Sequence, residues 1–189
     1  MLVGGLAVVC ALAACGSSSS SSSSNPLATE LSYIPPGSPV VATIATDPNS
    51  APVKNLGALL RKFQVASLIT SALKQQLQKQ GLSYDADIKP LFGNPAVVGG
   101  VETAGAGSKV QALGVWITKD ANKLNAVVTS SKNGDKKIGS HAGATLYRSR
   151  DGTSVYGVDG ATLVIADTQA LVNAALDRHA NNSGMTLSQ

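Results

Sequence analysis

Apolar and polar positions along the chain fall into two kinds of block. Short blocks rich in Val, Ile and Thr have the composition and alternation of half-buried strands. Longer blocks repeat apolar residues every three or four positions, as amphipathic helices do. The strand pattern occupies residues 39–46, 96–102, 109–118, 137–140, 145–148, 154–158 and 162–167. The helix pattern occupies residues 53–80, 119–130 and 169–179.

The first helical block carries two apolar stripes that are out of phase, so we expect a break near Gln64. The first stripe is Leu56, Leu59, Leu60 and Phe63, and the second is Leu68, Ile69, Ala72, Leu73 and Leu77. The other two helices should each bury one face. These faces are Leu124, Val127 and Val128 in one helix, and Leu171, Val172, Ala175 and Leu176 in the other.

Cap residues set the predicted ends of the helices. Residues 47–50, Asp-Pro-Asn-Ser, end the first strand and offer side-chain oxygens to the helix that follows. Asp120 and Thr168 are the expected caps of the next two long helices. Gly81 closes the first helical block, because glycine tolerates the left-handed conformation of a helix end.

Turn residues join the remaining elements. Asp87 is expected to cap a short helical turn that contains Pro90 in its tolerated first positions. Residues 103–108 form a predicted hairpin loop, and the Asp-Gly pairs at 151–152 and 159–160 predict two further hairpins. The elements, in the order β-α-β-β-α-β-β-β-α, predict an α+β fold: an antiparallel sheet with its helices packed on one face.

The amino-terminal region has a different composition. Residues 2–14 are uncharged and mostly apolar, which is typical of a signal peptide, and they are too few to span a bilayer. Met1 is followed by no Lys or Arg, which departs from the usual signal peptide and favours a true start further upstream. Leu12-Ala13-Ala14-Cys15 resembles a bacterial lipobox, which implies lipid attachment to the Cys15 thiol and removal of Cys10 with the leader.

Eight consecutive serines, Ser17 to Ser24, follow this cysteine and cannot bury apolar surface. The sequence therefore predicts a signal peptide at residues 1–14, a lipidated Cys15 with a flexible tether at 15–26, and a single domain at 27–182. Residues 183–189 are expected to be a tail that begins a truncated second half.

Composition narrows the class of partner. Hydrophobic residues make up 43% of the chain, which is enough for a packed core, while the net charge is only +4. No Lys/Arg cluster is interleaved with aromatic residues, so we expect no nucleic acid partner. The mild positive charge suits an anionic membrane surface.

Several stretches together resemble one family. These are residues 31–38 (Leu-Ser-Tyr-Ile-Pro-Pro-Gly-Ser), 47–50, 56–63 (Leu-Gly-Ala-Leu-Leu-Arg-Lys-Phe) and 81–93, of which residues 87–93, Asp-Ile-Lys-Pro-Leu-Phe-Gly, are the most specific. They resemble the bacterial envelope proteins grouped as domain of unknown function 3352, over most of residues 27–180. The resemblance implies an extracytoplasmic domain with no assigned activity and usually a second, similar half.

Few residues point to chemistry. His141 and His179 lie far apart and lack the ligand spacing of a zinc site. Residues 139–143, Gly-Ser-His-Ala-Gly, do not have the spacing of a nucleophile elbow. Residues 105–107, Gly-Ala-Gly, lack the third glycine and the helix of a phosphate loop.

Acidic residues near turns are the other candidates. Asp85 and Asp87 suit turn and cap roles better than acid–base catalysis. Asp47, Asn49 and Ser50 lie in a strand-end loop of the kind that can bind a cation, although capping is the simpler interpretation.

We therefore expect a non-enzymatic lipoprotein, anchored through Cys15 at the extracytoplasmic face of the cell membrane, that binds or scaffolds a component of the cell envelope, such as an envelope protein. The alternative is a carrier or chaperone for an apolar or lipid ligand, in which the sheet and helices leave a pocket between them. An enzyme of unrecognised type is a third hypothesis. No cofactor, metal ligand or catalytic residue is predicted.

Overall fold

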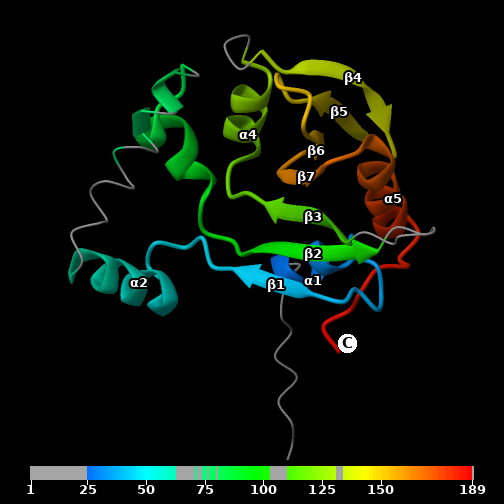
Figure 1. Ribbon diagram of the computed structural model, residues 1–189, viewed down its shortest axis with the longest axis horizontal. Helices are drawn as coiled ribbons and strands as arrows, with labels where there is room; N and C mark the ends of the chain where they lie inside the picture. Colours follow the sequence, from blue (N-terminus) through cyan, green and yellow to red (C-terminus); the bar gives the residue numbers. More distant parts are fainter. Residues whose placement is uncertain are drawn as a thin grey trace, which may run out of the picture.

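The computed structural model describes residues 25–62, 71, 74, 75, 77–79, 81–102, 110–130 and 134–188. Within them, seven antiparallel strands form one sheet in the order β1-β2-β3-β7-β6-β5-β4. The sheet curls into a half-barrel, with β1 and β4 at its two edges (Figure 1). The strands are β1 (Val41–Ile44), β2 (Ala96–Glu102), β3 (Val110–Ile117), β4 (Lys136–His141), β5 (Ala144–Arg148), β6 (Val155–Asp159) and β7 (Thr162–Ala166).

The α+β class and the antiparallel sheet are confirmed, and each predicted strand range contains a strand. The expected order of elements is one strand short, because four strands and not three follow α4 (Ala121–Val128). The first strand is shorter than expected. Its end is set by Thr46, whose hydroxyl accepts from the Gly93 N–H at 3.0 Å and donates to the Asn94 carbonyl.

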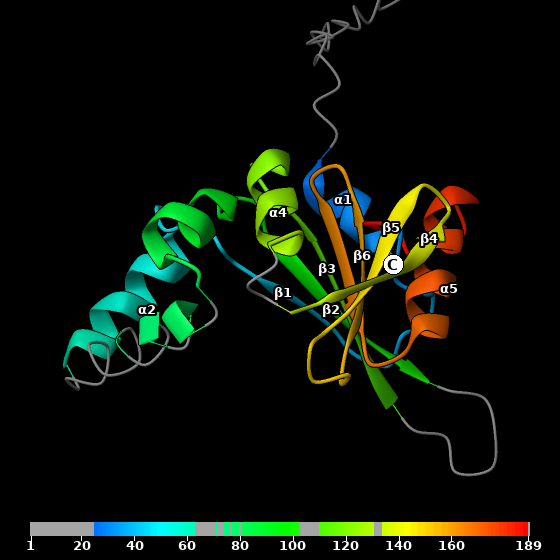
Figure 2. The ribbon, with the colours of Figure 1, turned by 90° about the horizontal axis from the view of Figure 1, so that it is seen from above.

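Three further helices have bounds within the described residues: α1 (Pro26–Leu31), α2 (Ala51–Lys62) and α5 (Gln169–Ala180). Residues 77–79 are also helical. A π-helical turn, η1 (Tyr84–Ile88), and a 3-10 turn, η2 (Lys89–Leu91), precede β2. Figure 2 shows α2 and α4 on one side of the sheet, with α4 nearer to the sheet than α2, and α5 on the opposite side. The predicted break near Gln64 and the loop at 103–108 lie outside the described residues.

Helix α1 is missing from the sequence prediction, which placed Pro26 in the tether. The Asn25 side chain accepts from the Leu27 N–H at 3.1 Å, and Pro26 occupies the first turn. An Asx cap followed by proline is a known start signal, so the helix was readable from the sequence.

Helices cover both faces of the sheet, which corrects the expectation that they gather on one. Consecutive residues of a strand point to opposite faces. On β5 and β6, Leu146 and Val155 belong to one buried cluster, while their neighbours Tyr147 and Tyr156 belong to another. The first cluster packs under α1 and α5, and the second packs under α4 through Leu124 and Val128. We call these sides the α5 face and the α4 face.

The helix caps are confirmed in two cases and wrong in one. Asp120 accepts from the Lys123 N–H at 2.9 Å, and Thr168 accepts from the Leu171 N–H at 3.3 Å. Asp87, expected to begin the short turn, instead accepts from the N–H of Ser83, the residue that caps η1 through the Ala86 N–H. The cap lies four residues earlier because this turn begins at Tyr84.

Glycine ends the first helical block as predicted. Gly81 has a φ of 72°, its N–H donates to the Gln78 carbonyl, and the Leu82 N–H donates to the Leu77 carbonyl, both at 2.9 Å. This pair of bonds is the Schellman motif. It turns the chain from the segment around Leu77 towards η1.

Candidate functional site

A cavity of about 700 Å³ opens on the α4 face, between the sheet, α4 and the chain from Leu77 to Leu91. Its volume lies in the range of small-molecule sites, about 300–1,000 Å³. Most of its lining is apolar, and the polar residues come mainly from two neighbouring loops. The lining residues are Leu77, Lys79, Leu82, Ile88, Leu91, Trp116, Leu124, Val127, Val128, Asp135, Ser149, Arg150, Asp151, Tyr156, Leu163 and Ile165.

The sheet supplies one apolar wall of the cavity, through alternate residues of the three central strands. Trp116 comes from β3, Tyr156 from β6, and Leu163 and Ile165 from β7. Ile165 is 39% exposed although it lies on a central strand. Its neighbour on β3 is Gly114, and a Cβ added to this glycine would lie only 2.9 Å from the Ile165 side chain. The glycine therefore leaves room for Ile165 at the cavity wall.

Helix α4 and the turns before β2 supply the opposite wall. Leu124 and Val128 of α4 pack with Leu91 of η2. The Leu91 carbonyl accepts from the Lys119 N–H at 3.1 Å, which joins η2 to the start of α4. These contacts fix η2 and α4 to each other on this side of the cavity.

Polar groups gather where the β5–β6 turn meets the chain before β4. The Asp135 carboxylate accepts from the Arg150 N–H at 2.9 Å and from the Tyr156 hydroxyl. Burial, followed by the hydrogen bond to Asp135 and the negative charge of that carboxylate, raises the pKa of Tyr156, which therefore stays a neutral donor.

Asp151 is the second acid at this end of the cavity. It accepts from the Ser149 hydroxyl at 2.7 Å and from the N–H and hydroxyl of Thr153 at 3.0 and 2.8 Å. These donors lower the pKa of Asp151 to about 2, so the carboxylate is charged at neutral pH.

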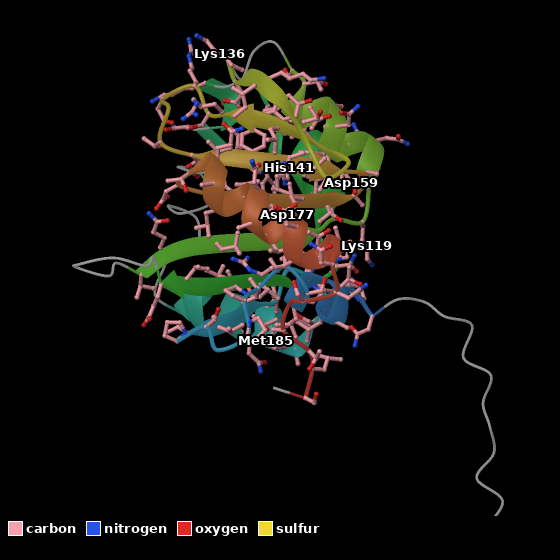
Figure 3. All side chains as sticks on the ribbon, turned by 90° about the vertical axis from the view of Figure 1, so that its right-hand side faces the viewer. Lys119, Lys136, His141, Asp159, Asp177 and Met185 are labelled. Atoms are coloured by element: carbon pink, nitrogen blue, oxygen red, sulfur yellow. The ribbon has the colours of Figure 1, made fainter. Side chains whose placement is uncertain are left out.

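The two histidines lie at separate positions on the α5 side. His141 of β4 pairs with Asp177 of α5 through Nε2 and Oδ1 at 2.7 Å, which ties the edge strand to the helix (Figure 3). His179 lies 2.6 Å from the Ser32 hydroxyl through Nδ1, and its ring stacks on Tyr33 with centroids 4.2 Å apart. Neither histidine lines the cavity. Among the described residues, no three His, Cys, Asp or Glu side chains gather as metal ligands.

The glycine-flanked stretch at 139–143 is a hairpin. Ser140 and His141 belong to β4, and Ala142 and Gly143 form a two-residue turn with φ values of 45° and 89°. Both turn residues have the positive φ of a type I′ turn. The Gly-Ala-Gly stretch at 105–107 lies outside the described residues.

The candidate acids near turns make local contacts. Asp85 pairs with Lys74 at 3.0 Å, and Asp87 makes the bond to Ser83 described above. Asp47 accepts from the Asn49 N–H at 2.8 Å through its side chain, and from the Ser50 hydroxyl at 2.7 Å through its carbonyl. These bonds shape the turn before α2.

A comparison with family models matches residues 1–186 to the family described as "Protein of unknown function (DUF3352)". The chain belongs to this family. The DUF3352 match covers more of the chain than residues 27–180, the range in which the sequence analysis found the resemblance. No curated protein and no solved structure matches this DUF3352 chain.

The stretch at 81–93, one of those that resemble DUF3352, has a clear place in the structure. It forms the Schellman turn, η1 and η2, and it contributes Leu82, Ile88 and Leu91 to the cavity. The expected lipid attachment site, Cys15, lies outside the described residues. No helix within the described part of the chain has the length and apolar character to span a membrane.

The sequence predicted a pocket between the sheet and the helices as part of the carrier alternative, but it did not identify the residues that line the cavity. The walls of the cavity come from residues far apart in the chain, and apolar residues such as Leu124 and Val128 have the same pattern whether they fill a core or line a pocket. The only available signal was Trp116, because the chain has one tryptophan and it falls in a predicted strand.

Proposed function

We propose that this protein is a non-enzymatic carrier that binds an apolar ligand in the cavity between α4 and the sheet. The observation that carries the proposal is a cavity of about 700 Å³ whose walls are mostly apolar. The α5 face offers a contrast, since its core residues Ile34, Leu113, Val164 and Val172 are fully buried in one packed cluster. An open apolar space favours ligand binding over scaffolding, because a scaffold needs only a packed core.

We further propose that the carrier is held at the extracytoplasmic face of the membrane through acyl chains on Cys15. The lipobox-like stretch at 12–15 and the serine tract at 17–24 support this location. A single acyl chain binds membranes only marginally, so two or three chains are needed for a stable anchor. A tether of about a dozen residues has a reach near 20 Å, which keeps the cavity close to lipid.

Trp116 provides the test of ligand binding, because it is the only tryptophan and it lines the cavity. We expect 1-dodecanol, a neutral straight-chain probe, to shift Trp116 fluorescence to shorter wavelength in a saturable way. Native mass spectrometry of the same sample should show one bound probe for each chain.

A variant of the cavity wall makes the test specific. Ile165→Gln places an amide against the ligand, and an unpaired buried polar group costs about 1–3 kcal/mol, so affinity for dodecanol should fall about tenfold. Ile44→Gln is the matched control, because Ile44 is 52% exposed on the edge strand β1 and does not line the cavity. Equal affinities of the two variants, or no saturable binding by the unsubstituted protein, would contradict the proposal.

A further inference from the structure

The polar lining of the cavity is gathered at one end. Asp135, Ser149, Arg150 and Asp151 come from two chain segments joined by the bond from the Arg150 N–H to Asp135 at 2.9 Å. Trp116 and Ile165, which line the cavity from β3 and β7, belong to its apolar wall. A site with one apolar part and one polar end suits a ligand that is itself amphiphilic.

The acids at this end already have donors within the protein. Both oxygens of Asp135 accept hydrogen bonds, one from the Arg150 N–H and one from Tyr156. Asp151 accepts three, from Ser149 and Thr153. The hydrogen bonds of both carboxylates are therefore made within the protein.

The two cations that line the cavity, unlike the acids, have side chains available to a ligand. Among the described residues, the guanidinium of Arg150 and the ammonium of Lys79 have no ion-pair partner. The stem of Arg150 lies over Gly134, where a Cβ would be 2.9 Å from the Arg150 Cδ. The missing side chain at Gly134 therefore gives Arg150 a defined path next to the cavity.

We propose that the ligand is an anionic single-chain amphiphile, whose alkyl chain lies against Trp116 and Ile165 and whose head binds the guanidinium of Arg150. This inference rests on the proposed function and names the class of ligand. Arg150 presents several N–H donors to a carboxylate or phosphate, and charge-assisted bonds of this kind are stronger than neutral ones. Lys79 also lines the cavity and adds a second positive charge to it.

Two probes with the same alkyl chain and different heads measure the contribution of the charged head to binding. Dodecanoate and 1-dodecanol are titrated below their aggregation limits, with Trp116 fluorescence as the readout. We expect the protein to bind dodecanoate about tenfold more tightly than dodecanol, as a charge-assisted bond at a partly exposed site allows. Added salt should reduce this preference, because it screens exposed charges.

Substitution of the cation identifies the binding group. Arg150→Gln should remove most of the preference for dodecanoate and leave dodecanol affinity unchanged. Arg148→Gln is the matched control, since Arg148 is an exposed residue of β5 that does not line the cavity. Lys79→Gln gives a second variant away from the β5–β6 turn, and it should lower dodecanoate affinity by a smaller factor. A circular dichroism melt verifies the fold of each.

The outcomes distinguish this inference from the proposed function. Equal binding of dodecanoate and dodecanol by the unsubstituted protein, or an undiminished preference in Arg150→Gln, overturns the anionic head and leaves the apolar site standing. Binding of neither probe overturns both. To distinguish a free fatty acid from a membrane-derived lipid, lysophosphatidylglycerol with a twelve-carbon chain is added as a competitor below its aggregation limit: displacement of labelled dodecanoate at a lower concentration than unlabelled dodecanoate requires favours the membrane-derived lipid as the source.

Discussion

At the scale of single residues, the most unusual group is Glu30, an acid buried in α1. Its side chain is fully inaccessible, and one carboxyl oxygen accepts from the Ile117 N–H at 2.9 Å. The other oxygen is buried, and no group in the described part of the chain forms a hydrogen bond with it. Burial raises the pKa of Glu30 from 4.5 to about 7, against the lowering effect of the bond to Ile117. The cost of this burial therefore depends on pH.

This gives a prediction for stability against pH. Because the folded-state pKa is raised, the folded protein holds a proton between pH 4.5 and about 7 that the unfolded chain has lost. The free energy of unfolding should therefore fall as pH rises through that window. Glu30→Gln should flatten the profile and be more stable than the unsubstituted protein at pH 8, by up to about 3 kcal/mol.

Urea denaturation at a series of pH values measures the effect. Glu102→Gln is the control, because Glu102 is exposed at the end of β2 and should leave the pH profile unchanged. An unaltered profile in Glu30→Gln would show that Glu30 does not titrate in this window.

At the scale of elements, helix α5 shows how local signals and packing combine. Thr168 caps its amino terminus, and Leu171, Val172, Ala175 and Leu176 are buried against the α5 face. Asp177 attaches the helix to β4 through its pair with His141. Arg178 attaches it to the chain after α1, because its side chain donates to the Tyr33 carbonyl at 3.1 Å. Cap and apolar stripe were both predicted from the sequence, and the attachments were not.

The cap of α5 yields a second prediction. Thr168→Ala removes the acceptor of the Leu171 N–H and should lower the free energy of unfolding by about 1 kcal/mol. Thermal or urea denaturation measures the change. Thr43→Ala on the edge strand β1 is the control, because Thr43 is exposed and caps no helix. A loss no larger than that of the control would mean that packing alone sets the start of α5.

At the scale of the whole molecule, the two faces of the half-barrel differ in how they are packed. The α5 face is a packed core closed by α1 and α5, and the α4 face holds a smaller cluster with the cavity beside it. Because α1 begins at Pro26, the packed side of the domain follows directly after the predicted tether. A carrier of this design would have its rigid core near the anchor and its ligand site on the other face of the sheet.

Membrane attachment is tested at this scale. Cells that express the full chain are labelled with an alkyne fatty acid, and we expect Cys15→Ala to abolish both the label and the membrane fraction of the protein. Cys10→Ala is the matched control, since Cys10 is expected to be removed with the leader and its substitution should leave the label intact. Equal labelling of the Cys15→Ala variant would rule out this anchor.

The sequence by itself determined the features that depend on neighbours in the chain. Period-two and helical patterns located the strands and the long helices, and Asp120, Thr168 and Gly81 marked helix ends, because caps and turns are formed by residues within a few positions of each other. It missed α1, one strand in the element order and the true cap of η1, although the Asn25-Pro26 signal was present. Only the tertiary structure decided which face each helix covers, that Glu30 is buried and that Trp116, Ile165 and Arg150 share a cavity. Those features depend on the curvature of the sheet and on contacts between distant segments, which local patterns do not specify.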